Sequence, residues 1–308
     1  MHFPDNKGKP SGLEKHKGGT MKKVLVVLMA LALLLPSMAF AGGSKESGGM
    51  NLMIYTSMKE NLISQIVDKF TELHPEVSVD YYSAGAGKLM AKIATERQAG
   101  SVACDVLWTS EVPDFIGLRD EGVLLPYKSP EREYVVSTID DPDGYFTAAR
   151  LGTLGICYNT DLVKEPPKTW DDLLDPLYKG NFSIANPALS GTSMVPVAMM
   201  VENLGWDYIQ KLADNGARMG QGSGQVVDDT AAGDTYAAIG VDYITLDKIA
   251  KGATLGFAYT DQMLVIPSPV AIMAGTKNEE AAKLFVDFLL SKEGQECVAA
   301  AYTLPVRE

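Results

Sequence analysis

Histidine, cysteine and clusters of basic residues are scarce in this sequence, and each shortage excludes a class of function. The 308 residues include three histidines and three cysteines, and 39 acidic residues outnumber 27 lysines and arginines. An acidic chain without a basic cluster binds nucleic acid and anionic membranes poorly, so no nucleic-acid partner is expected. A hydrophobic share of 46% and a charged share of 21% exclude a disordered chain. The length suggests two domains or lobes.

The first 41 residues have the pattern of an export signal. Two lysines precede the apolar run 24–35, and a small-x-small sequence ends at Ala41. We therefore predict a cleavable signal peptide over 21–41, preceded by an untranslated or disordered extension over 1–20 and followed by a linker over 42–49. Since no cysteine directly follows the cleavage site, we expect a periplasmic or extracellular protein that is not a lipoprotein.

Removal of residues 1–41 leaves the mature chain with fewer histidines and a more negative net charge. It takes away six lysines, two acidic residues and two histidines, so the net charge changes from −12 to −16 and His74 alone remains. One histidine is too little for a histidine-based triad or a metal site with several histidine ligands, so we predict that the protein is not an enzyme. The cysteines lie far apart without a CxxC motif, and their surroundings favour buried packing for Cys104, Cys157 and Cys297.

Strand and helix patterns alternate twice along the chain. Over 51–108, short apolar strands alternate with two helical patterns, and a second alternation runs over 146–243. A strand pattern over 264–273 then precedes a helix over 278–290. Such alternation is typical of α/β lobes, in which the loops at the strand ends gather and bind ligands.

The chain also contains short phrases that are informative when they are taken together. They are Ile54-Tyr-Thr-Ser57, Ala103-Cys-Asp-Val-Leu-Trp108, Tyr158-Asn-Thr160, Pro167-Lys-Thr-Trp-Asp-Asp-Leu-Leu-Asp-Pro176, Lys179-Gly180, Ala231-Ala-Gly-Asp234, Ala281 to Leu290 and Ser291-Lys-Glu-Gly-Gln295. In their order and spacing they resemble the periplasmic solute-binding proteins of ABC importers, in extracellular solute-binding family 1 and its ferric-iron-binding-protein branch. The resemblance covers roughly 50–308.

This resemblance implies an α/β, two-lobed type II periplasmic-binding-protein-like fold. Each lobe has a mixed sheet flanked by helices, and two crossing strands, near 146–156 and 257–266, join the lobes so that they close on a ligand by hinge motion. Lobe one is expected over 50–150 plus 262–308, and lobe two over 151–261. We expect a monomer whose partners are a small anionic ligand and the membrane permease and ATPase of an ABC importer.

Hydroxyl and glycine residues cluster where predicted strands give way to helices. A helix N-terminus carries unpaired backbone N–H groups and a partial positive charge, which suits phosphate or carboxylate, and glycine lets the backbone approach closely. The alternative is that these residues only cap helices, as Ser57 with Glu60 would. The candidate anion-binding residues are Ser57, Gly85, Gly87, Thr109, Ser110, Ser190, Gly191, Thr192 and Ser223.

The resemblance also bears on a metal site. Ferric-binding relatives hold a phosphate-like anion at the phrase matching 190–192, with a residue near Ser223, and hold iron through adjacent tyrosines after the strand matching 237–243. Here Tyr243 has no neighbouring tyrosine, and one phenolate with Asp242 offers few anionic oxygens for a ferric ion. No metal site and no cofactor are therefore expected. The alternative is a ferric site that uses Tyr243, Asp242 and a bound synergistic anion.

The sequence allows two interpretations for each of three further side chains. Asp242 could accept hydrogen bonds from a sugar hydroxyl or pair with an ammonium group of the ligand. Trp108 could stack on a sugar ring or belong to the core, and Lys88 could pair with the anion or lie solvated on a helix face. A weakened metal site beside an intact anion site predicts the binding of a phosphorylated sugar or a phosphonate for import.

Two other kinds of function remain open from the sequence. One is a ferric iron-binding protein of an iron(III) importer. The other is a secreted acid–base hydrolase or a sensory receptor on the same fold, for which paired carboxylates such as Asp171-Asp172 and Asp228-Asp229 would be candidates. Both pairs lie at predicted first turns of helices, where acidic residues are common, so the hydrolase is disfavoured.

Overall fold

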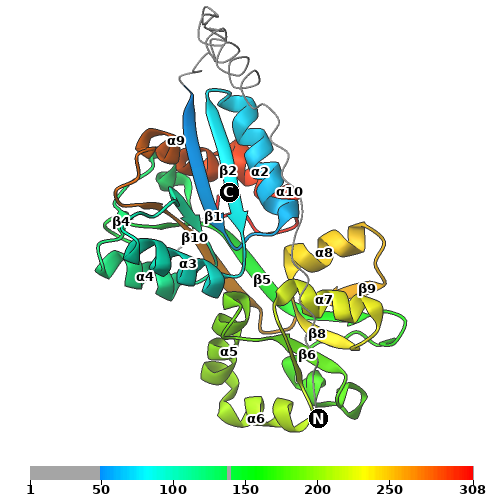
Figure 1. Ribbon diagram of the computed structural model, residues 1–308. Coiled ribbons are helices and arrows are strands. Elements are labelled where there is room, and N and C mark those ends of the chain that lie inside the picture. Colours follow the sequence, from blue (N-terminus) through cyan, green and yellow to red (C-terminus); the bar gives the residue numbers. More distant parts are fainter. Residues whose placement is uncertain (1–48, 137–139, 308) are drawn as a thin grey trace, which may run out of the picture. The chain divides into compact units, whose positions relative to one another are not determined.

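A mixed sheet of ten strands is the frame of the computed structural model, which describes residues 49–136 and 140–307. The predicted extension over 1–20, the signal peptide over 21–41 and nearly all of the linker lie outside the described residues. The strands pair in the order β2-β1-β3-β10-β5-β8-β6-β7, with β4 beside β10 and β9 beside β5. Figure 1 shows this frame with its helices.

Helices and short strands alternate through most of the chain. The strands are β1 (Met50–Thr56), β2 (Val77–Ser83), β3 (Val106–Trp108), β4 (Leu124–Leu125), β5 (Thr147–Asn159), β6 (Phe182–Ala185), β7 (Arg218–Gly220), β8 (Ala237–Val241), β9 (Leu255–Ala258) and β10 (Leu264–Met273). The α-helices are α2 (Glu60–Leu73), α3 (Ala86–Gln98), α4 (Val112–Asp120), α5 (Gly191–Leu204), α6 (Trp206–Asp214), α7 (Ser223–Ala232), α8 (Asp242–Ala250), α9 (Glu279–Leu290) and α10 (Lys292–Ala300). The 3₁₀ helices are η1 (Pro130–Tyr134), η2 (Trp170–Leu174) and η3 (Pro176–Tyr178).

The first half of the sheet is formed by β1, β2 and β3, which run parallel. Helix α2 connects β1 to β2 and buries an apolar face at helical spacing, formed by Leu62, Ile63, Ile66, Val67 and Phe70. Because the strands are parallel, their carboxyl ends lie at one edge, and the starts of α2, α3 and α4 lie at that edge too.

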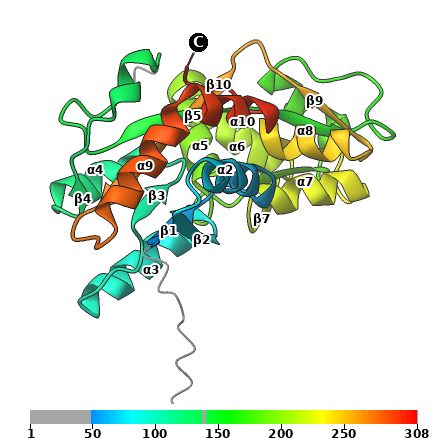
Figure 2. The same cartoon turned by 90° about the horizontal axis from the view of Figure 1, so that it is seen from above.

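The second half of the sheet repeats this arrangement with β6, β7 and β8. Strand β6 pairs parallel with both β7 and β8. The chain leaves the carboxyl ends of these three strands into α5, α7 and α8, respectively. Helices α7 and α8 lie side by side in both views (Figures 1 and 2). Each half therefore presents a set of helix N-termini at its strand ends.

Two long antiparallel strands, β5 and β10, join the halves. Strand β10 pairs with β3 through 270–272, and β5 pairs with β8 through 154–158, while β5 and β10 pair with each other in between. The first predicted crossing, near 146–156, coincides with β5. The second differs from the prediction, because 255–258 forms β9, which pairs with the far end of β5, and the returning strand is β10.

The C-terminal helices pack back on the first half of the sheet. The ring of Phe70 on α2 lies 5.3 Å from that of Phe285 and 5.5 Å from that of Phe288, both on α9. Figure 2 shows α9 and α10 beside α2. The end of the chain therefore packs against α2, the helix that connects β1 to β2.

The structure confirms the predicted class, a mixed α/β fold of the type II binding-protein kind, although its strands pair as one continuous sheet. Within the described residues all three cysteines are free thiols. Cys104 and Cys157 are buried as predicted, whereas Cys297 is only partly buried, so the prediction was wrong for this residue. None of the helices in the described part of the chain has the length and apolar character that crossing a membrane requires.

Candidate ligand-binding site

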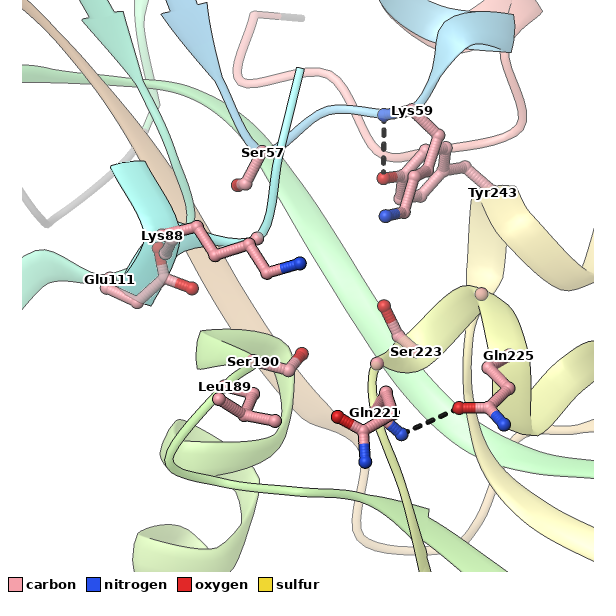
Figure 3. Close-up of a pocket in the computed structure, with 14 residues that line it drawn as sticks. Ser57, Lys59, Lys88, Glu111, Leu189, Ser190, Gln221, Ser223, Gln225 and Tyr243 are labelled. Atoms are coloured by element: carbon pink, nitrogen blue, oxygen red, sulfur yellow. Dashed lines mark hydrogen bonds between the residues drawn. The ribbon is translucent and has the colours of Figure 1, made fainter. Parts of the chain in front are cut away.

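Four helices begin around one cavity of about 260 Å³, which lies at the strand ends of both halves of the sheet (Figure 3). Lys59 directly precedes α2, Gly85 precedes α3, Ser190 precedes α5, and Gly222 precedes α7. The described residues that line the cavity are Ser57, Lys59, Gly85, Ala86, Lys88, Glu111, Leu189, Ser190, Gln221, Gly222, Ser223, Gly224, Gln225 and Tyr243.

The helix starts bring unpaired backbone donors to this cavity. Within the described residues, α2, α3 and α7 begin without a side-chain cap hydrogen bond, and the first turns of α3, α5 and α7 contain no acidic residue. The first N–H groups of a helix have no partner within the helix, and the helix dipole adds a partial positive charge there. An anion in the cavity would accept hydrogen bonds from these N–H groups and would interact favourably with the partial positive charge.

Glycine permits the two halves to approach each other beside the cavity. A Cβ atom at Gly85 would lie 2.9 Å from the carbonyl oxygen of Leu189, and one at Gly87 would lie 3.3 Å from that of Ala188. The start of α3 can therefore meet the loop before α5 only because these positions lack side chains. Gly85 lines the cavity. Gly87 is not part of the lining, but it allows the same close contact with the loop before α5.

Two lysines make the cavity positive within an acidic protein. Lys59 is half-buried, and the loss of solvent lowers the pKa of its ammonium group. Lys88 is exposed, and Figure 3 shows its side chain extending over the cavity. Ser57 adds a hydroxyl oxygen that is buried and has no hydrogen-bond partner among the described residues. An oxygen of an anionic ligand would accept a hydrogen bond from this hydroxyl.

Glu111 is the one carboxylate among the described residues that line the cavity. It is only 2% exposed, and its Oε2 accepts a hydrogen bond from the backbone N–H of Ser110 at 2.9 Å. Burial raises the pKa of this carboxyl from its ordinary 4.5 to about 7. The cavity thus combines several donors for an anion with one acceptor that is weakly acidic.

Tyr243 closes one wall through a contact between the halves. Its hydroxyl accepts a hydrogen bond from the backbone N–H of Lys59 at 3.2 Å, and the guanidinium carbon of Arg150 lies 4.7 Å from its ring centroid. Burial raises the pKa of the phenol. A neutral, already engaged phenol of this kind is a poor metal ligand.

The comparisons with known proteins agree with this geometry. A family model for bacterial extracellular solute-binding proteins matches residues 55–296. The chain belongs to this family. The function of such proteins is to bind a solute in the periplasm for an ABC importer.

Three similar proteins differ in what their names say they bind. A relative from Salmonella typhimurium, named "Putative 2-aminoethylphosphonate-binding periplasmic protein", is 27% identical over 78% of this chain and 72% of its own. The structure of AfuA from Actinobacillus pleuropneumoniae, with bound fructose-6-phosphate, is 27% identical, with a TM-score of 0.76 over 83% of this chain and 85% of AfuA. Iron-bound HitA from Pseudomonas aeruginosa is 24% identical, with a TM-score of 0.72 over 84% of this chain and 87% of HitA, and supports the fold alone.

The structure brings five of the predicted site residues together in the solute-binding protein. These residues, which line the cavity, are Ser57, Gly85, Ser190, Ser223 and Tyr243. Gly191 and Thr192 form the first turn of α5, but their side chains lie outside what the structure describes.

The remaining predicted residues are placed away from the lining. Trp108, Thr109 and Ser110 are at most 1% exposed, because β3 ends inside the sheet, and Ser110 Oγ lies 3.1 Å from Ser268 Oγ on β10. Trp108 is thus a core residue. Sequence reasoning placed the site here because these residues follow a strand, but it did not show that β10 covers them.

Asp242 is also turned away from the cavity. Its Oδ2 accepts hydrogen bonds from the backbone N–H and the hydroxyl of Thr153, at 3.0 and 2.9 Å, and from the hydroxyl of Thr303 at 3.2 Å. Thr303 in turn accepts from Arg150 Nη1 at 2.8 Å. Asp242 therefore links β5, α8 and the C-terminal segment, and it is 1% exposed.

Sequence reasoning missed several residues of the lining. Lys59, Glu111, Gln221 and Gln225 were not among the candidates, and Lys88 was left with two readings. A usable signal existed for Glu111, because it directly follows a predicted strand end. The glutamines carried no signal, since their place depends on where β7 and α7 meet the other half.

Proposed function

We propose that this solute-binding protein captures a small organic phosphate or phosphonate in the cavity and delivers it to the permease and ATPase of an ABC importer. The observation that carries the proposal is the convergence of four helix starts and two lysines on one cavity. Backbone N–H groups at helix N-termini with nearby lysines are a common way to bind a phosphoryl group. The names of AfuA and of the Salmonella relative support the same ligand class.

The size of the cavity favours a small solute. Its 260 Å³ lies below the range of about 300–1,000 Å³ that is usual for drug-sized ligands. Helix N-termini also let an acidic protein bind an anion, because the donors act at hydrogen-bond distance while the net charge of the chain is screened by salt.

The geometry supports the ferric alternative less well. Tyr243 is protonated and engaged by Lys59, and the Asp242 carboxylate faces Thr153. Within the described residues, no three histidine, cysteine, aspartate or glutamate side chains are placed together to hold a metal ion. We therefore propose that neither iron nor a cofactor is needed for binding.

Binding without catalysis is part of the proposal. His74 directly follows the C-terminal end of α2, whereas the cavity lies at the start of this helix. A helix of 14 residues spans roughly 21 Å, so the imidazole cannot reach a ligand in the cavity. We further propose export through a cleaved signal peptide without a lipid anchor, which N-terminal sequencing of the periplasmic protein would test.

Calorimetric titration tests the ligand class. Protein purified from the periplasm of an expressing bacterium is titrated with 2-aminoethylphosphonate, fructose 6-phosphate, inorganic phosphate and ferric citrate. The proposal expects saturable binding of at least one organic phosphate or phosphonate. Binding of ferric citrate alone, with a visible tyrosinate-to-iron absorption band, would refute it.

A further inference from the structure

Glu111 is out of place in a cavity that otherwise offers donors to an anion. It directly precedes α4, and it is only 2% exposed. Figure 3 shows its carboxylate turned toward the space between Lys88 and Ser190. A carboxylate can accept several hydrogen bonds. Among the described residues this one accepts one from the N–H of Ser110 at 2.9 Å, and the neighbouring hydroxyl of Thr109 also lowers its pKa. The carboxylate of Glu111 can therefore accept further hydrogen bonds from a ligand in the cavity.

The protein itself supplies no ion pair to this carboxylate among the described residues. The buried cation Arg150 on β5 is engaged by other groups, since its guanidinium donates to Thr303 Oγ1 at 2.8 Å and to Met58 Sδ at 3.0 Å. Its charge still lowers the pKa of Glu111, while the charge of Asp114 on α4 raises it. A buried carboxylate that lacks a paired cation is costly unless a ligand provides one.

Three other titratable groups line the same cavity, one directly before α2 and one each on α3 and α8. Tyr243 is buried and neutral, and Lys59 and Lys88 lie beside the helix starts that would hold the phosphoryl group. A dianionic head group paired with the two lysines leaves the negative charge of Glu111 uncompensated. Either a proton taken up by Glu111 or a positive group on the ligand then balances this charge, and only the positive group lets the carboxylate stay ionised.

We infer that Glu111 determines the specificity of the cavity by pairing with an ammonium group, so that the ligand is a small zwitterion with a phosphonate or phosphate at one end and an amine at the other. This inference rests on the proposed function, because it assigns the second end of a ligand whose first end is the phosphoryl group. A hydroxylated sugar phosphate could hydrogen-bond to Glu111 but would leave its charge unpaired.

The pairing predicts a proton linkage with a definite sign. An ammonium group beside Glu111 favours the carboxylate and lowers its pKa, so binding releases protons near pH 7 and affinity rises with pH. A phosphonate without an amine brings only negative charge, which raises the pKa of Glu111, so its binding takes up protons. Ionisation of the ligand itself contributes equally in wild-type protein and in Glu111→Gln. The difference in the number of protons released by the two proteins on binding therefore reports on Glu111 alone.

Calorimetric titration with a matched pair of ligands tests the inference. Wild-type protein is expected to bind 2-aminoethylphosphonate about 10- to 100-fold more tightly than ethylphosphonate, as for a hydrogen-bonded charged group. Glu111→Gln should erase this preference and the proton release, measured in buffers of different ionisation enthalpy. Glu202→Gln makes the same chemical change at an exposed position on α5 outside the lining and should keep both.

Each other outcome overturns the inference in a recognisable way. Equal wild-type affinity for the two phosphonates would remove the ammonium pairing while leaving phosphoryl binding intact, and this comparison does not depend on the folding of a variant. Tighter binding of fructose 6-phosphate, lost in Glu111→Gln, would assign Glu111 to a hydroxyl. Binding of neither phosphonate nor sugar phosphate would refute the proposed function itself.

Discussion

The backbone N–H of Lys59 and the hydroxyl of Tyr243 form a hydrogen bond of 3.2 Å that joins the start of α2 to the start of α8. Asn61 reinforces it, since its Nδ2 donates to the carbonyl oxygen of Tyr243 at 3.4 Å. The two helices follow strands from opposite halves of the sheet, so these bonds bridge the halves beside the cavity. The side chain of Tyr243 thus serves as a bridge between the halves.

Tyr243→Phe separates the bridging role from metal binding. The substitution removes one acceptor for the Lys59 N–H, so we expect stability to fall by about 1 kcal/mol and affinity for a phosphonate to change by less than about fivefold. Thermal melting and calorimetric titration measure the two effects. Loss of all ligand binding together with loss of an iron absorption band would contradict this account.

Gly85→Ala tests the close approach of the two halves. Its new Cβ would lie 2.9 Å from the Leu189 carbonyl oxygen, so the start of α3 must move away from the loop before α5. We expect anion affinity to fall about 10-fold, the effect of losing one charge-assisted hydrogen bond. The control is Gly117→Ala on α4, where no atom lies within 4 Å of the new Cβ. Similar affinities for both variants would show that the approach is not needed.

Lys88→Met tests the electrostatic part of anion binding. Removing this exposed cation should weaken phosphonate binding about 3- to 10-fold and flatten its dependence on salt, because exposed charges are screened. The control is Lys164→Met, since Lys164 is also exposed but donates to the carbonyl oxygen of Thr160 outside the lining. Equal salt dependence in the two variants would contradict a role for Lys88.

The raised pKa of Glu111 predicts a pH dependence of stability in the ligand-free protein. The folded state binds this proton up to pH of about 7 and the unfolded state only up to about 4.5, so Glu111 lowers stability progressively as the pH rises between these values. The full effect is a few kcal/mol, at about 1.4 kcal/mol per pKa unit. Glu111→Gln should therefore gain stability relative to wild type between pH 5 and pH 8 in thermal melts. A constant difference across this range would contradict the assignment.

Local patterns sufficed to predict much of the fold. The helix with Leu62, Ile66 and Phe70 on one face is α2, and the strand pattern after 146 is β5. Both are set by spacing within one segment. The second crossing was misplaced because 255–258 and 264–273 are both strand-like, and only pairing partners distinguish β9 from β10.

The site was predicted less completely, because it depends on how the two halves meet. The rule that ligands bind at strand ends identified Ser57, Gly85 and Ser223. It could not show that β10 covers Ser110 or that Asp242 turns toward Thr153, since these side chains are directed by distant segments.

A crystal structure of the protein with 2-aminoethylphosphonate tests the central claim most directly. The account predicts phosphonate oxygens within hydrogen-bond distance of backbone N–H groups at the starts of α3, α5 and α7, with Lys88 or Lys59 beside them. A phosphonate bound away from these helix starts, or a metal ion held by Tyr243 in its place, would contradict it.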